Sequence, residues 1–203
     1  MPFVGNGGWL RVSASSAKRD TKQELVAATI RLASSSGLES ASVRSITRAA
    51  GVTEGALYRH YRSKDELWRD VYARIVDAMA EDKAAILCLD AGARERVREW
   101  VRLTYKYYDG NRDAFNYVLM MPRDIAESFG DLYTKQGELF GRLYEQFRAA
   151  GGVRDMPVVL AAALFGGLLL SVPRQINDGL LTGPASSYTD EVADAAWRLL
   201  GRE

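Results

Sequence analysis

Side chains that can donate hydrogen bonds gather between residues 42 and 64, where the sequence reads SVRSITRAAGVTEGALYRHYRSK. The donors are the hydroxyl, imidazole and ammonium groups of Ser42, Thr53, Tyr58, His60 and Lys64. Such groups contact phosphate oxygens in protein–DNA complexes. Thr53 also stands where a helix is expected to begin, and free amides at a helix start favour phosphate. The stretch therefore indicates contact with a nucleic-acid backbone.

Two short helices joined by a tight turn would bring these donors to one side. Ser42 can cap the first helix, whose apolar positions include Val43 and Ile46, and Gly51 ends it. Thr53 can cap the second helix, which continues to Tyr61. This is the helix-turn-helix pattern, in which the second helix enters the major groove of DNA.

The amino-acid sequence of this stretch is more specific than the helix-turn-helix pattern alone. The matching segments are AAGV at 49–52, GALYRHY at 55–61 and SKDEL at 63–67. Together they resemble the DNA-binding domain of the TetR family of bacterial transcriptional repressors, over about residues 20–70. The resemblance implies phosphate contacts, which position the protein without reading bases, from Thr53, Tyr58, His60 and Lys64.

Base readout involves the neighbouring residues. The resemblance implies that Arg44, near the start of its helix, can reach a base edge, and arginine to guanine is the commonest specific contact. Gly55 and Ala56 would allow close approach to the groove, with the Ala56 methyl against a thymine methyl. Glu54 either accepts from cytosine or stabilises the helix start. Arg59 either contacts phosphate or folds back on the body.

The charge distribution agrees with a DNA-binding head. The whole chain of 203 residues has a net charge of +1. Residues 18–64 carry nine Lys or Arg and four Asp or Glu, whereas residues 65–203 carry 17 and 22. A basic head on an acidic body suits one domain that faces a polyanion and another that does not.

The same composition argues against several classes of site. Cys88 is the only cysteine, which excludes an intramolecular disulfide and a cysteine-based zinc site. His60 is the only histidine, and it lacks a partner for catalysis or metal binding. We therefore expect no catalytic residue, no metal and no cofactor. A core position for His60 remains the alternative to a phosphate contact.

Three segments organise the chain. Residues 1–17 are rich in Gly and Ser and are expected to form a disordered arm. Residues 18–64 form the DNA-binding domain, and its basic start is either a DNA-contacting arm or a solvated leader. Residues 65–203 form a helical ligand-binding and dimerisation domain. Capping boxes are expected at Thr21 with Glu24 and at Ser63 with Glu66.

The fold class expected is all-α, because no stretch alternates as a strand does. The first helix of the head should run from Thr21 to Ser36, and a long helix should start at Ser63. The body helices are expected at Ala93–Tyr108, Arg112–Met121, Ile125–Phe129, Leu132–Ala150, Pro157–Asp178 and Thr189–Leu200. Pro173 should kink its helix. The apolar run Val158–Leu170 is shorter than a membrane span and no secretory signal is visible, so we expect a cytoplasmic protein with no membrane partner.

Large side chains are frequent in the body, and most fill a core. Some could line a cavity for a small apolar or aromatic effector, a feature that the TetR resemblance implies. The candidate ligand-binding residues are Trp100, Tyr105, Tyr108, Phe115, Met120 and Tyr144.

The run Val158–Leu170 is apolar on all sides, which indicates burial on more than one face. It is either a central core helix or part of a homodimer seam, which the resemblance favours. In that seam it would form a four-helix bundle with residues 189–200 and their symmetry mates. The candidate interface residues are Leu164, Gly166, Gly167, Leu170 and Trp197.

These observations predict a homodimeric repressor that binds a double-stranded, pseudo-palindromic operator and is released by a small, largely apolar effector. The alternative is a DNA-bound architectural or adaptor protein without an inducer. An enzyme that uses the aromatic cavity is a further rival, which no nucleophile–base pair, metal cluster or phosphate loop supports.

Overall fold

The computed structural model describes residues 20–119 and 121–202. Our expectations for residues 1–17 and for Met120 lie outside the described residues. Within the described ranges the regular structure is helical, with one isolated bridge between Val153 and Gly201, which confirms the all-α class. The helices are α1 Thr21–Ser36, α2 Val43–Ala50, α3 Glu54–His60, α4 Lys64–Ala84, α5 Ala93–Gly110, α6 Arg112–Leu119, α7 Arg123–Glu127, α8 Asp131–Ala149, α9 Val158–Asn177 and α10 Thr189–Leu200.

The first three helices form a compact head around their own apolar core. Leu25 of α1, Ile46 of α2 and Leu57 of α3 are completely buried together. The start of α1 differs from our expectation by one residue. Asp20 is the cap, because its carboxylate accepts from the Lys22 amide at 3.0 Å. Thr21 is the first helical residue, so the predicted capping box at Thr21 was wrong.

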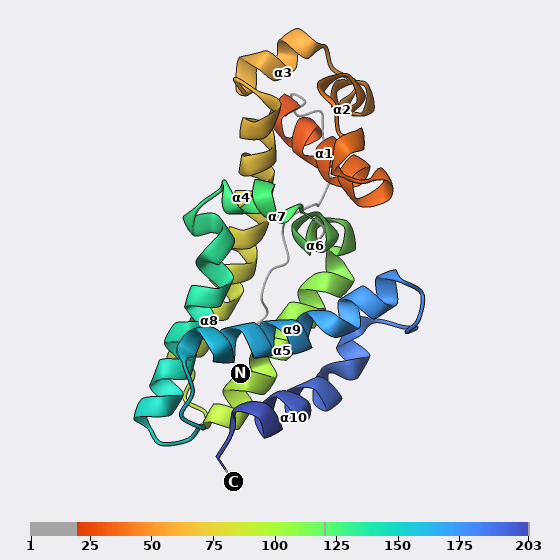
Figure 1. The fold of residues 1–203 in the computed structure, drawn as a ribbon. Helices are drawn as coiled ribbons and strands as arrows, with labels where there is room; N and C mark the ends of the chain where they lie inside the picture. Colours follow the sequence, from red (N-terminus) through yellow and green to blue (C-terminus); the bar gives the residue numbers. More distant parts are fainter. Residues whose placement is uncertain (1–19, 120, 203) are drawn as a thin grey trace.

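The long helix α4 joins the head to the body (Figure 1). Ser63 caps it, since its hydroxyl accepts from the Glu66 amide at 3.1 Å. Glu66 completes a variant of the predicted capping box, because its carboxylate accepts from the Arg62 amide rather than from that of Ser63. At about 1.5 Å per residue, a helix of 21 residues spans roughly 30 Å. One end of α4 therefore belongs to the head and the other to the body.

The body is built around α4, α5, α8 and α9 (Figure 1). Helix α8 packs along α4 and against α9, and α10 packs along α5. Helix α6 lies at the junction, where it contacts α1 of the head as well as α4 and α5. The short helix α7 lies beside it in Figure 1. The junction is thus formed mainly by α4 and α6.

Helix α9 continues through Pro173 to Asn177. A proline at this position leaves the carbonyl four residues earlier, that of Leu169, without its usual backbone donor. The hydroxyl of Tyr105 on α5 donates to this Leu169 carbonyl at 3.1 Å, and Tyr105 is fully buried. The tyrosine thus satisfies a buried acceptor that the proline would otherwise leave unpaired. The expected kink stays a prediction.

By length and composition alone, α9 could cross a membrane, so our argument from the shorter apolar run does not hold. Core helices of folded proteins pass the same test. Here Ala161, Phe165 and Leu169 of α9 are buried in the body against neighbouring helices. The inward face of α9 thus has the character of a core helix.

Candidate nucleic-acid interface and effector cavity

The turn between α2 and α3 depends on a glycine. Gly51 adopts a φ of 66°, in the left-handed region, and its amide donates to the Arg48 carbonyl at 3.2 Å. A side chain is strained at this φ, which explains glycine between the two helices. The predicted caps on either side are confirmed. Ser42 accepts from the Ser45 amide and Thr53 from the Ala56 amide, each at 3.2 Å.

Helix α3 buries one side chain and exposes most of the others. Leu57 is fully buried, whereas Tyr58 is 54% exposed, and Arg59 and His60 are exposed as well. The exposed position of His60 argues against the core alternative. The hydroxyl of Thr53 can still donate to a phosphate oxygen while it accepts from the helix backbone. Thr53, Tyr58 and His60 are therefore all accessible to a DNA backbone.

The start of α3 has small or acidic residues that face outward. Glu54 and Gly55 are exposed, and Ala56 is half-buried. A Cβ atom added to Gly55 would meet only the Thr53 hydroxyl, at 3.9 Å, so packing within the protein does not require glycine there. Glu54 lies in the first turn, where a carboxylate stabilises the helix dipole. The Arg59 guanidinium folds back along its own helix, with Nε 3.4 Å from the Gly55 carbonyl.

The remaining predicted DNA contacts come from the adjoining helices. Arg44 is exposed near the start of α2. Lys64, at the start of α4, is half-buried and lies over the ring of Trp68, with Nζ 4.1 Å from the ring centroid. A cation above an indole face is stabilised by the ring quadrupole. Lys64 thus keeps its charge close to the head surface.

A charged cluster joins the head to α4. Asp70 accepts from the Tyr61 hydroxyl at 2.7 Å and from Arg74 at 3.0 Å, and Lys22 of α1 lies 3.4 Å away. Partial burial opposes ionisation of Asp70, but the Tyr61 hydrogen bond and the Arg74 charge hold its pKa below the usual value. Sequence reasoning missed this cluster, which links three separate elements.

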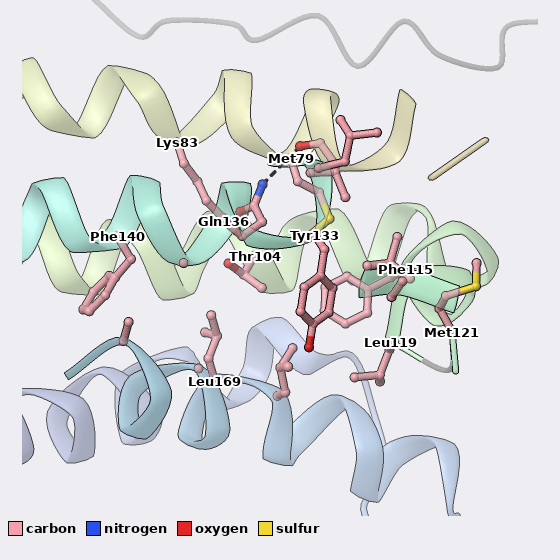
Figure 2. A pocket seen from close by; sticks show the side chains of 18 of the residues that line it. Met79, Lys83, Thr104, Phe115, Leu119, Met121, Tyr133, Gln136, Phe140 and Leu169 are labelled. Atoms are coloured by element: carbon pink, nitrogen blue, oxygen red, sulfur yellow. Dashed lines mark hydrogen bonds between the residues drawn. The ribbon is translucent and has the colours of Figure 1, made fainter. Parts of the chain in front are cut away.

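A cavity of about 400 Å³ lies in the body (Figure 2). Most of its lining is apolar, as expected of a small-molecule site. The apolar and aromatic lining residues include Tyr72, Val76, Met79, Trp100, Phe115, Val118, Leu119, Met121, Phe140, Phe165 and Leu169. The polar and charged ones are Lys83, Thr104, Arg123, Tyr133, Gln136 and Arg174. The walls come from α4 to α9, so helices that join the head also border the cavity.

The predicted ligand-binding residues divide into two groups. Trp100 and Phe115 line the cavity. Tyr105, Tyr108 and Tyr144 are not among its lining residues. All three are buried, and each uses its hydroxyl within the fold: Tyr105 donates to Leu169, Tyr108 to Asn177 and Tyr144 to the Arg154 carbonyl. The first two join α5 to α9, and the third joins α8 to the segment that follows it.

Lys83 is a lining residue that sequence reasoning missed. It is 3% exposed, and its Nζ donates to the Gln136 side chain at 3.0 Å (Figure 2). Burial lowers its pKa to about 7, a shift that nearby Asp82 opposes. A signal was present, because Lys83 follows Val76 and Met79 at the helical spacing of the buried stripe of α4.

The outer face of α9 carries apolar side chains that the rest of the body does not cover. Val159 is 81% exposed, Leu160 47% and Leu164 41%. Gly167 continues this stripe and is exposed, with nothing within 4 Å of an added Cβ. An exposed apolar stripe of this kind is typical of an interaction surface.

The other predicted interface residues lie elsewhere on the two helices. Gly166 and Leu170 are half-buried and line the cavity. Trp197 of α10 is half-buried and packs against the backbone at Gly201, where an added Cβ would lie 2.7 Å from its ring. Of the five predicted residues, Leu164 and Gly167 therefore lie on the exposed stripe of α9.

Comparison with known proteins agrees with this architecture. Residues 25–71 match the profile of the bacterial regulatory proteins of the tetR family. The chain is 37% identical over 54 residues to the HTH-type transcriptional regulator AcrR of Shigella flexneri, a match that spans 27% of this chain and 25% of that protein. It is also 25% identical over 204 residues to the nucleoid occlusion factor SlmA of Photobacterium profundum, which spans 94% of this chain and 98% of SlmA.

A solved structure extends the likeness to the body. The crystal structure of a tetR family transcription regulator from Shewanella sp. PV-4 superposes with a TM-score of 0.75, at 20% identity, over 91% of this chain and all of that chain. At this identity the likeness shows the fold of head and body together. Residues 25–71, with their exposed helix-turn-helix, thus form a DNA-binding head of the tetR family type, on a body whose fold is that of the solved tetR family regulator.

Proposed function

We propose that the protein is a homodimeric repressor that binds a pseudo-palindromic operator and leaves it when a small, largely apolar effector fills the cavity. The position of α6 is the observation that carries this proposal. Phe115, Val118 and Leu119 of α6 line the cavity, and the same helix packs against α1 of the head. A ligand that moves these side chains would also act on the DNA-binding head.

A tilt of α4 from its far end, near Met79, is a second route by which a ligand could act on the head. Met79 and Lys83 of α4 line the cavity as well, and both α4 and α6 contact α1 of the head. An effector can shift the equilibrium only if it binds the released state more tightly than the DNA-bound state. A 100-fold preference supplies about 2.7 kcal/mol of coupling at each site.

The proposed DNA contacts are those on the open side of the head. Replacement of Tyr58, His60 or Lys64 by Ala should weaken binding to all DNA sequences to a similar extent, because phosphate contacts do not read bases. Arg44→Ala should instead relax specificity at one base pair, at a cost of roughly 1–3 kcal/mol there. Gel shifts with operator variants distinguish the phosphate-contact role from the base-reading role. The first DNA to test is that beside the protein's own gene. Equal losses for every operator variant would rule out base reading by Arg44.

Dimerisation is proposed through the exposed stripe of α9, together with α10. A helix-turn-helix dimer reads two half-sites about 34–36 Å apart, one turn of DNA. The stripe is apolar, and Gly167 would let a symmetry-related helix approach closely. Two copies of one stripe form the self-complementary contact that two-fold symmetry requires.

The experiment that tests the whole proposal is a screen for operator release. Apolar and aromatic compounds of drug-like size are added to the protein–operator complex, and release is followed by fluorescence anisotropy. Trp100→Ala and Phe115→Ala should change the half-effective concentration, because both rings line the cavity. Tyr144→Phe is the matched control, since that ring lies outside it. Release that neither cavity variant affects would place the effector site elsewhere.

A DNA-bound adaptor without an inducer is the second candidate. The full-length similarity to SlmA, named as a nucleoid occlusion factor, favours it. Such a protein would hold its DNA site in the presence of every cavity ligand, and its body would bind a protein partner instead. The presence of a cavity that borders α6 favours the repressor. Either function would place the protein in the cytoplasm, on the nucleoid.

A further inference from the structure

The cavity contains a buried cation without a buried anion. Lys83 extends from α4 between α5 and α8, with Nζ 5.1 Å from the centroid of the Trp100 ring. An ammonium group has three hydrogen-bond donors. Among the residues that the structure describes, Lys83 makes one hydrogen bond, to Gln136, and no ion pair. Buried charges in proteins are normally paired, so this one has capacity for a partner.

The lining of the whole cavity also has positive charges but no negative ones. Its charged members are Lys83, Arg123 and Arg174, and it includes no carboxylate. The two arginines differ from the lysine, because both are exposed, and Arg123 is paired with Glu127 at 2.6 Å. The charge that would attract a ligand group inside the cavity is therefore that of Lys83.

The surroundings of Lys83 include few other ionisable groups. Asp82, next to it on α4, is the charge that acts on its ammonium, and it also raises the pKa of Tyr107 on α5, after the larger effect of burial. Gln136 on α8 is neutral, and its amide nitrogen donates to the Val76 carbonyl at 3.1 Å. Its side-chain oxygen thereby stays directed at Lys83.

We propose that the effector of this cavity is an apolar molecule with a single carboxylate, which pairs with the ammonium of Lys83 while its apolar part extends toward Phe115. The proposal rests on the effector cavity described under the proposed function and gives it a ligand class. It narrows the largely apolar effector of that proposal to a monoanion. One buried cation balances one negative charge, so a monoanion fits better than a phosphate dianion.

The layout of the cavity gives the direction of the ligand. In Figure 2 the side chains of Lys83 and Gln136 lie at one end, and those of Phe115, Leu119 and Met121 lie at the other. Arg123, two residues after Met121 in the chain, also lines the cavity, but it is exposed and paired with Glu127. A carboxylate at Lys83 would thus place the hydrocarbon against α6, the helix that contacts the head.

Pairing with an anion should couple binding to a proton. In the empty cavity the pKa of Lys83 is about 7, and a bound carboxylate would raise it by favouring the ammonium. Binding therefore takes up a proton above that pH. The affinity for a carboxylate should be constant below about pH 7 and fall about tenfold per pH unit above it.

The test compares dodecanoate with dodecanol by isothermal titration calorimetry on the full chain. Lys83→Met removes the charge and keeps a flexible apolar side chain, so the fold should be retained. Lys106→Met is the matched control, at an exposed lysine of α5 that does not line the cavity. Dodecanoate should bind the wild type and the Lys106 variant alike, and the Lys83 variant at least tenfold more weakly. Dodecanol should bind all three equally, without a change between about pH 6.5 and about pH 8.5.

Two results would overturn the assignment. One is a loss of less than threefold in the Lys83 variant. The other is a failure of dodecanoate, octanoate and palmitate to bind more tightly than the matching alcohols. Operator release is measured separately, by gel shift. Binding that depends on Lys83 without release would support the ligand class and contradict the ligand-responsive part of the proposed function.

Discussion

The hydrogen bond between Tyr105 and the carbonyl that Pro173 leaves free can be tested by a double-mutant cycle. Tyr105→Phe removes the hydroxyl and leaves the Leu169 carbonyl buried without a donor. Such a loss costs about 1–3 kcal/mol. In a protein of this length, a change of this size lowers the melting temperature by several degrees. The Pro173→Ala background supplies a backbone amide at the right position, so the same Tyr105 change should cost about 1 kcal/mol less there.

The assay is urea unfolding followed by helical circular dichroism, at one fixed protein concentration because a dimer's stability depends on it. Tyr144→Phe is the control, since Tyr144 also donates to a backbone carbonyl, that of Arg154, which lies outside any helix. Its cost should be the same in both backgrounds. Equal costs for Tyr105→Phe with and without Pro173 would refute the argument that the tyrosine compensates for the proline.

Three further predictions concern the head and the seam. Ser63→Ala should lower stability by about 1 kcal/mol in urea unfolding, because the start of α4 loses its cap; no loss would contradict the capping role. Asp70→Asn should make the stability fall less steeply as the pH is lowered, measured as the melting temperature at a series of pH values. The pKa of Asp70 is lowered in the folded state, so its contribution is present above the ordinary carboxyl pKa of about 4 and is lost below it. The same loss of stability on acidification in the variant and the wild type would contradict this. Gly167→Glu should give monomers with poor operator affinity, measured by sedimentation, since it places a charge on the exposed stripe of α9; an intact dimer would move the interface elsewhere.

The head could be predicted closely because local rules decide it. The hydroxyl caps at Ser42, Thr53 and Ser63 and the glycine in the turn fix where three helices begin or end, and each is visible in a few consecutive residues. Body helices were predicted to within a few residues for the same reason, and Thr189–Leu200 was predicted with the bounds that the structure shows. Asp20 took the cap of α1 because either polar residue could serve there.

The cavity could not be predicted to the same degree, since its lining depends on how distant helices pack. Tyr105 and Trp100 are both buried on α5. The Tyr105 hydroxyl reaches the Leu169 carbonyl, whereas the Trp100 ring borders the cavity. Lys83 was overlooked because lysine is rarely buried fully. Its position on the buried stripe of α4 was the sequence signal that indicated burial.

The side chain of Asn177 ties the carboxyl end of α9 to α5 and α6. It accepts from Tyr108 of α5 at 2.8 Å and from Arg112 of α6 at 3.1 Å, and it donates to Asn116 of α6 at 2.6 Å.

A second hydrogen bond ties α6 to α4. The buried hydroxyl of Tyr117 donates to the Trp68 carbonyl at 3.0 Å, while Leu119 at the end of α6 lines the cavity. A displacement of α6 should therefore be passed on to α4, the helix that joins the head to the body.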